Sequence, residues 1–190
     1  MFVIASFFIA QAQVKAPKRV SQQAEEAFVR KFVQRFYDWY GPAATHFFDN
    51  NGPVDPERIA LKSKAEMFNP ELRKLLLDDL RATDESKDGE AGIDYMPFFG
   101  AQDFCEHYSI PSVRRDGARW LVEVRGINDA HYGGSVPDLI AVVEKVNTKY
   151  GWRFANFIYD NNGRNLMSDL KEEMHITGSR GRRHKITTVH

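Results

Sequence analysis

Two side chains near the middle of the chain have the types and the spacing that acid–base chemistry uses. Asp103 and His107 lie four residues apart, and residues at an even spacing in a β-strand point to the same side of the sheet. A carboxylate or an imidazole can act as a general base when burial moves its pKa towards neutrality. The alternative, which we favour, is that Asp103 closes a turn by accepting backbone hydrogen bonds while His107 lies on the surface.

Other side chains in the second half of the chain could bind a ligand. Asp94, Tyr95 and Tyr108 are further acid–base or hydrogen-bonding candidates. His131 and Tyr132 precede two glycines, and an aromatic side chain in such a loop is expected to be exposed and available for contact. We therefore predict that Asp94, Tyr95, His131 and Tyr132 are binding residues, with an unknown protein or small ligand as the partner.

Several other kinds of site lack their sequence signatures. The chain has neither a phosphate-binding glycine motif nor a serine-nucleophile elbow. The Asx residues of 49–55 and 160–162 do not have the order of a calcium loop and are more typical of turns. Cys105 is the single cysteine, which we expect to be a buried, unreactive thiol. We predict no metal and no cofactor.

The elements that must position these residues begin with an aromatic helix. Ser21 is a suitable N-cap, and Gly41 followed by proline is expected to end the helix at Tyr40. The apolar positions of this helix form a wide stripe that predicts a buried face. They are Phe28, Val29, Phe32, Val33, Phe36, Tyr37 and Tyr40.

Two further helices and then a series of strands are expected to follow a loop over residues 43–56. The first helix is expected over Arg58–Met67, and the second starts at Asn69-Pro70. We expect residues 83–92 to form a charged loop. A strand over 104–113 is expected to be interrupted by Pro111, and Asp116-Gly117 predicts a hairpin.

Residues 117–159 alternate apolar side chains as antiparallel strands do. Trp152 could stack on a ligand, although an aromatic side chain at strand spacing is more often part of the core. A closing helix is expected over 165–174, and helices followed by a curved meander predict a cone-shaped α+β domain.

The start of the chain indicates export. Residues 2–10 are uncharged and largely apolar, and Ala10-Gln11-Ala12 has the small-x-small pattern of a cleavage site. Such a stretch is too short to span a bilayer, which needs about 20 apolar residues. We therefore expect a signal peptide and linker over 1–20, one domain over 21–175 and a basic disordered tail over 176–190. The expected location is periplasmic or secreted, with no integral membrane segment in the mature chain.

The overall charge gives no reason to expect nucleic acid as a partner. Lys plus Arg and Asp plus Glu both number 26, so the net charge is zero and no global field attracts a polyanion. Basic residues gather in the tail at Arg180, Arg182, Arg183 and Lys185, where they are expected to be solvated. We also consider a homodimer as the state of assembly.

Several short motifs together resemble a family of small bacterial envelope proteins known as the domain of unknown function DUF3828, within the NTF2-like or cystatin-like grouping. The motifs are Phe32 to Tyr40, Asn69 to Leu72, Ile93 to Phe98, Gln102-Asp103 and Trp152-Arg153-Phe154 near Ile158-Tyr159. The resemblance covers about residues 22–173 and implies an NTF2-like cone in which N-terminal helices lie on a curved antiparallel sheet. Members are typically exported or lipid-anchored, but this chain has no cysteine directly after its leader to which a lipid could be attached. The resemblance implies no catalytic residues.

Two functions are consistent with these features. The first, which we favour, is a non-catalytic binding or accessory module of the cell envelope, using its cleft or the Tyr132 loop. The second is a small cone-fold enzyme, a hydrolase, isomerase or dehydratase, that uses Asp103 with His107. The two differ in whether both side chains reach one solvent-accessible cavity.

Overall fold

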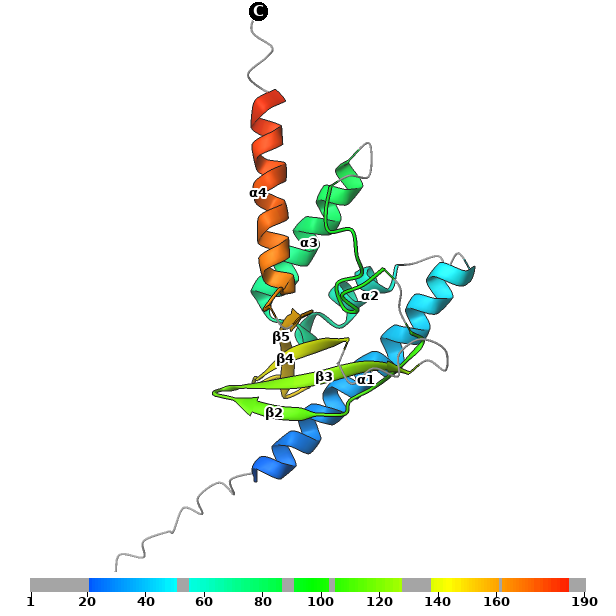
Figure 1. Cartoon of the computed structure of the whole chain (residues 1–190), viewed down its shortest axis with the longest axis vertical. Helices are drawn as coiled ribbons and strands as arrows, with labels where there is room; N and C mark the ends of the chain where they lie inside the picture. The colour runs from blue at the N-terminus through cyan, green and yellow to red at the C-terminus, as the bar shows by residue number, and fades with distance from the viewer. Residues whose placement is uncertain are drawn as a thin grey trace, which may run out of the picture.

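The protein has an α+β fold in which helices pack on one face and at one edge of an open antiparallel sheet (Figure 1). The computed structural model describes residues 21–50, 55–86, 91–102, 105–127, 138–160 and 162–184. Side chains are described for the same residues except Asn50 and 176–184. This part of the chain contains four α-helices, one 3-10 turn and five strands, which confirms the predicted fold class.

The sheet is built around its longest strand. Its order is β1-β3-β4-β5, with β2 also paired to β3, and all pairs are antiparallel. The strands are β1 (His107–Ser109), β2 (Val113–Asp116), β3 (Arg119–Ile127), β4 (Leu139–Lys145) and β5 (Trp152–Ile158). A register shift between β4 and β5 at Val142/Val143 adds local twist to the sheet.

Strands β1 and β2 are two parts of one sheet edge. Both pair with β3, and the backbone between them contains Pro111, which cannot donate a ladder hydrogen bond. The predicted interruption at Pro111 is therefore confirmed. The predicted hairpin is confirmed as well, because β2 and β3 are joined at Asp116-Gly117 and Gly117 has a φ of 57°.

Helix α1 (Gln22–Asn50) crosses one face of the sheet, and its start is as predicted (Figure 1). The hydroxyl of Ser21 accepts a hydrogen bond from the Ala24 amide at 3.2 Å, as an N-cap does. Most of the predicted stripe is buried, with Phe32 7% and Phe36 1% exposed. Phe28 is the exception, because 57% of it is exposed although it was expected to be buried.

The predicted end of this helix at Tyr40 is wrong, and so is the predicted loop over its last residues. The helix continues through Pro42 to Asn50. Proline within a helix removes one hydrogen bond and costs about 3 kcal/mol, so tertiary contacts must offset it. Tyr40 and Ala44 are buried on either side of Pro42, and this packing holds the extra turns against the domain.

The next two helices begin at side-chain caps. Helix α2 (Pro56–Ser63) is capped by Asp55, and a 3-10 turn, η1 (Ala65–Met67), follows it, so the expected helix over 58–67 is divided in two. Helix α3 (Pro70–Glu85) begins as predicted: the Asn69 carboxamide oxygen accepts from the Glu71 amide at 2.9 Å. It ends later than predicted and includes the first residues of the expected charged loop.

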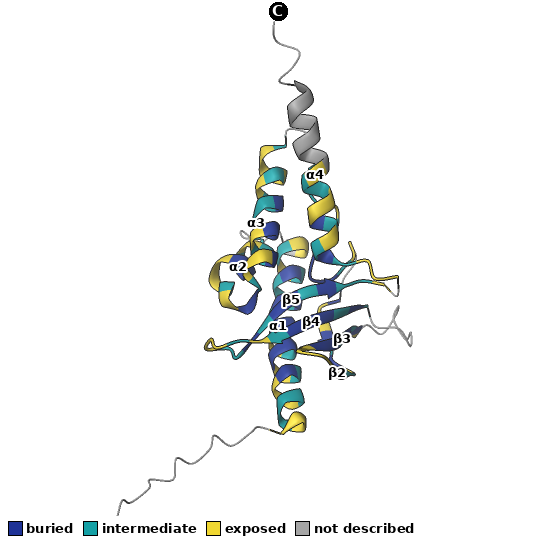
Figure 2. Ribbon diagram, turned by 90° about the vertical axis from the view of Figure 1, so that its left-hand side faces the viewer, coloured by how far each residue is buried: buried dark blue, intermediate teal, exposed yellow. Residues whose placement is uncertain are grey.

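Helix α4 (Leu166–His184) is also longer than predicted. Its backbone remains helical for ten residues beyond the expected end at residue 174 and includes part of the sequence that we expected to be a tail. Helices α3 and α4 stand side by side beyond the β5 edge of the sheet (Figures 1 and 2). In the described residues no helix is both long enough and apolar enough to cross a bilayer.

The core lies between α1, the following helices and the inner face of the sheet, where buried residues gather in Figure 2. Phe36 is at its centre: its ring centroid lies 4.9 Å from that of Phe154 on β5 and 5.4 Å from that of Phe98. Trp120, Val122 and Val124 contribute from β3. This aromatic packing fixes α1 on the sheet and thereby fixes the residues at its surface.

Candidate functional site

The predicted site residues do not form one site in the described part of the chain. Asp103, His131 and Tyr132 lie outside the described residues. His107 is exposed on β1, and its partner across the ladder, Ile127, is 55% exposed. The His107 side chain therefore lies at an open edge of the sheet, which agrees with the surface position that we favoured.

Tyr95 takes part in a polar cluster with α4. Its hydroxyl donates to the Asp169 carboxylate at 2.6 Å, and Arg164 donates to the same carboxylate at 3.0 Å. Burial raises the pKa of Tyr95, and the hydrogen bond to Asp169 raises it further. The preceding residue, Asp94, is exposed, and its carbonyl accepts from Gln102 at 3.0 Å. The bond from Tyr95 to Asp169 ties the segment to α4.

Two other predictions concern turns and the cysteine. The Asp160 carboxylate accepts from the amides of Asn162 and Arg164 at 2.8 and 3.0 Å, so it closes a turn as predicted. Within the described residues no three His, Cys, Asp or Glu side chains are grouped as metal ligands would be. Cys105 is buried as predicted, and burial raises the pKa of its thiol.

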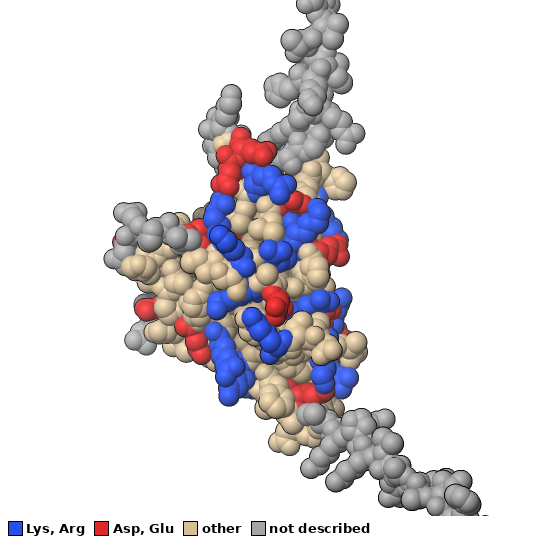
Figure 3. Space-filling model, turned by 180° about the vertical axis from the view of Figure 1, so that it is seen from behind, with Lys and Arg blue, Asp and Glu red and all other residues tan. Residues whose placement is uncertain are grey.

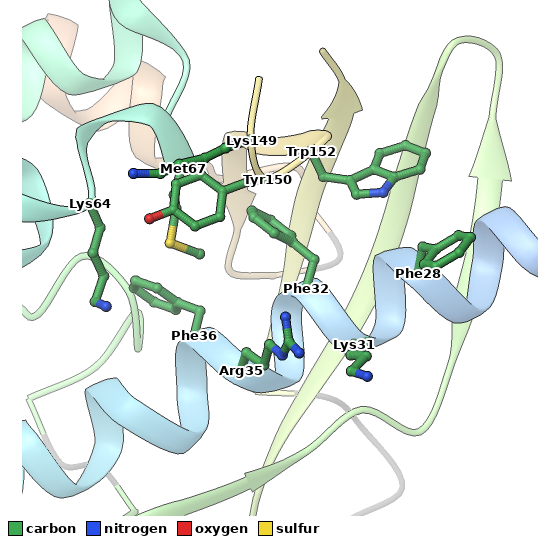
Figure 4. Close-up of a pocket in the computed structure, with 10 residues that line it drawn as sticks. All are labelled: Phe28, Lys31, Phe32, Arg35, Phe36, Lys64, Met67, Lys149, Tyr150 and Trp152. Carbon is green, nitrogen blue, oxygen red and sulfur yellow. The ribbon is translucent and has the colours of Figure 1, made fainter. Parts of the chain in front are cut away.

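A different group of residues forms a cavity of about 300 Å³ on the surface of α1 (Figure 4). We call it the basic pocket. Three segments far apart in the sequence contribute to it: α1, the residues from the end of α2 to η1, and the turn that leads into β5. Its lining residues are Phe28, Lys31, Phe32, Arg35, Phe36, Lys64, Met67, Lys149, Tyr150 and Trp152.

The basic pocket has an apolar floor with cations around it. Its buried part consists of Phe32, Phe36, Met67 and Trp152. In Figure 4 the Arg35 guanidinium is directed from α1 towards Phe32. Lys64 and Lys149 lie at one end of the pocket, and Phe28 and Trp152 lie at the other. The two ends therefore differ in chemistry.

The charge of this lining is unbalanced. Among its described residues it includes four Lys or Arg residues and no Asp or Glu. None of the four makes an ion pair with a carboxylate of the described residues. The Lys64 ammonium instead lies 4.4 Å from the ring centroid of Trp39, and that of Lys149 lies 5.0 Å from the ring centroid of Tyr150. Lys64 and Lys149 are thus positioned beside rings, and none of the four cations is neutralised by an ion pair within the described residues.

A larger cavity between α2 and α3 also has basic residues, but most of them are already bonded. It measures about 750 Å³ and includes Arg58, Arg73 and Arg81. Arg58 pairs with Asp84 at 2.6 Å, and Arg81 pairs with Asp78 at 3.3 Å. Arg73 donates to the Leu61 carbonyl at 2.8 Å. This cavity is more open to solvent, so the basic pocket is the better candidate site.

Charge is unevenly distributed over the molecule, although the net charge is zero. Figure 3 shows a face on which Lys and Arg atoms outnumber those of Asp and Glu. Such a face creates a local positive potential that the total charge does not report.

Comparison with known proteins does not decide the function. No protein-family model, curated protein or solved structure matches the chain significantly. The resemblance to DUF3828 therefore remains a prediction, and the function has to be argued from the basic pocket itself.

Most of the basic pocket was not predicted from the sequence, although one of its residues was considered. Trp152 was weighed as a ligand-stacking residue, and it lines the pocket. One local signal was present in α1: Phe28, Lys31, Phe32 and Arg35 are three or four residues apart and so share one side of the helix. Lys64 and Lys149 gave no such signal, because only the tertiary fold places them beside α1.

Proposed function

We propose that this protein is a non-catalytic binding module whose ligand is a small anion held in the basic pocket. The observation that supports the proposal is the lining of that pocket, which places four cations around an apolar floor with no carboxylate among them. Like charges around one recess repel one another unless a counter-charge is supplied. A bound anion supplies it, while the apolar floor limits competition from water.

The pocket also favours binding over catalysis. Its described side chains are cations, aromatic rings and a thioether. The lining thus provides no carboxylate or imidazole as a general base. The acid–base candidate His107 and the hydrogen-bonded Tyr95 are not among the lining residues.

The test is isothermal titration calorimetry of the full chain with inorganic phosphate and with a panel of organic carboxylates and sulfonates. We expect binding by the wild type and a loss of at least tenfold in the Arg35→Gln/Lys64→Gln double variant, since each hydrogen bond to a charged group contributes about 1.5–3 kcal/mol. Lys74→Gln is the matched control, because Lys74 is exposed on α3 and lies outside the pocket. The proposal would be contradicted if none of these anions bound, or if Lys74→Gln lost as much affinity as the double variant.

We further propose that the module acts in the cell envelope, on the basis of the leader-like residues 2–12. Mass spectrometry of the protein from its own host tests this. Recovery from the envelope fraction with a mass that begins at Gln13 is expected, and recovery from the cytosol with Met1 intact would refute it.

A further inference from the structure

The apolar stripe of α1 continues beyond the residues that are buried in the core. Phe32 and Phe36 are buried, but Phe28, one turn earlier in the same stripe, is 57% exposed at the rim of the basic pocket. Exposed apolar area in contact with a concave site is commonly covered by a ligand. Phe28 thus offers a surface that a bare inorganic anion would leave in water.

Two of the four lining cations lie at the opposite end of the pocket from the exposed ring, and a third, Lys31, lies on α1 between Arg35 and Phe28. Lys64 and Lys149 are at one end, whereas Phe28 lies opposite Trp152 at the other (Figure 4). Arg35 lies between the ends and directs its guanidinium inwards. A ligand that satisfies both ends must carry its charge at one end and an apolar body at the other.

We propose that the ligand of the basic pocket is an amphiphilic organic anion: its acid group is bound near Lys64, Lys149 and Arg35, and its apolar body lies against Phe28 and Trp152. This rests on the proposed anion-binding function and adds the class of ligand and its orientation. The volume of about 300 Å³ is at the lower end for ligand sites and equals that of about ten water molecules. The apolar body is therefore compact rather than a long acyl chain.

Three probes separate charge from apolar contact. Anilinonaphthalene sulfonate carries both an acid group and an aromatic body. Phenylnaphthylamine has a similar aromatic body without the charge, and inorganic phosphate has the charge without the body. Fluorescence titration measures the affinity for the first two probes, and calorimetry measures that for phosphate. The wild type is expected to bind the sulfonate at least tenfold more tightly than either of the others.

Two variants of the same type on one helix identify the apolar contact. Phe28→Ala is expected to weaken sulfonate binding about tenfold and to leave phosphate affinity unchanged. The variant loses the apolar contact with the ligand, and burying a phenylalanine ring fully is worth a few tens of cal/mol per Å² of its area. Phe48→Ala is the matched control, because Phe48 is also on α1, is 53% exposed and lies outside the pocket. It is expected to change neither affinity. Circular dichroism on both variants checks that the fold is retained.

The outcomes distinguish this inference from the function on which it rests. If phosphate binds as tightly as the sulfonate and Phe28→Ala has no effect, the anion site stands and the amphiphilic ligand is refuted. If phenylnaphthylamine binds as tightly as the sulfonate and phosphate does not bind, the site is apolar only and both proposals are refuted. If Arg35→Gln/Lys64→Gln weakens the sulfonate and phosphate alike while Phe28→Ala weakens the sulfonate alone, both are supported.

Discussion

Asp79 on α3 is a carboxylate in an unfavourable environment, because only 6% of it is exposed. One carboxylate oxygen accepts from the Ile93 amide at 3.1 Å, which fixes the segment after residue 90 against the helix. The pKa of Asp79 is raised from 3.8 to about 6 as the net result of three causes: burial raises it most, the bond from Ile93 lowers it, and the negative charge of Glu173 on α4 raises it. At neutral pH Asp79 is therefore charged in the folded protein, although its buried position favours the neutral acid.

The sign of the resulting pH dependence follows from this direction. The native state holds the Asp79 proton more tightly than the unfolded state does. Between about pH 4 and pH 6 the native state therefore binds more protons than the unfolded state, and its stability falls as the pH rises. We predict that Asp79→Asn, which keeps an oxygen for the Ile93 amide, increases the free energy of unfolding by roughly 1–3 kcal/mol at neutral pH. Below about pH 4 the gain should disappear.

Chemical denaturation at several pH values measures this difference. Glu85→Gln serves as the control, because Glu85 is an exposed carboxylate at the end of the same helix. A difference between Asp79→Asn and the wild type that stays constant from acid to neutral pH would show that Asp79 is not the titrating group.

At the scale of elements, helix α1 shows both what the sequence predicts and what it does not. The spacing of Phe32, Phe36 and Tyr40 correctly predicted a buried face, because it depends only on helical periodicity. The end of the helix was wrong, because the penalty for Pro42 is local whereas the contacts that offset it come from other segments. The backbone of residues 105–106 also approaches this part of the helix closely, at Gly41.

Gly41 is therefore a packing residue rather than a helix stop. A Cβ built at this position would lie 2.1 Å from the Glu106 carbonyl oxygen, closer than any real contact. We predict that Gly41→Ala destabilises the fold by about 1–3 kcal/mol through overpacking. Helix propensity alone predicts the opposite sign, a gain of up to about 1 kcal/mol. The shift of the urea midpoint measures the sign, and a stabilised variant would refute the close approach.

The assembly of the basic pocket could not be predicted by the same local reasoning. Strand and hairpin signals at Asp116-Gly117 depend on neighbours in the sequence, and they were correct. The pocket instead requires Lys64 and Lys149, which are 85 residues apart, to reach the same side of α1. That arrangement depends on helix–sheet packing, and no periodicity along the chain encodes it.

At the scale of the whole molecule, the even balance of 26 basic and 26 acidic residues removes any long-range attraction for anions. Attraction must then come from the local excess of cations, of which Lys31, Arg35 and Lys149 are exposed to solvent and to salt. The Debye length falls from about 30 Å at 0.01 M salt to about 8 Å at 0.15 M. We predict that the affinity for anilinonaphthalene sulfonate falls several-fold over this range of sodium chloride.

The same titration on variants shows where the field originates. If the basic pocket is its source, the salt dependence should be much reduced in Arg35→Gln/Lys64→Gln, which removes two of the four lining cations. It should be unchanged in Lys74→Gln, which removes one charge from elsewhere on the surface. Binding of uncharged phenylnaphthylamine should not weaken with salt, because screening acts only on charge. If both variants showed the same salt dependence, the anion would respond to the charge of the whole surface, and the basic pocket would not be the binding site.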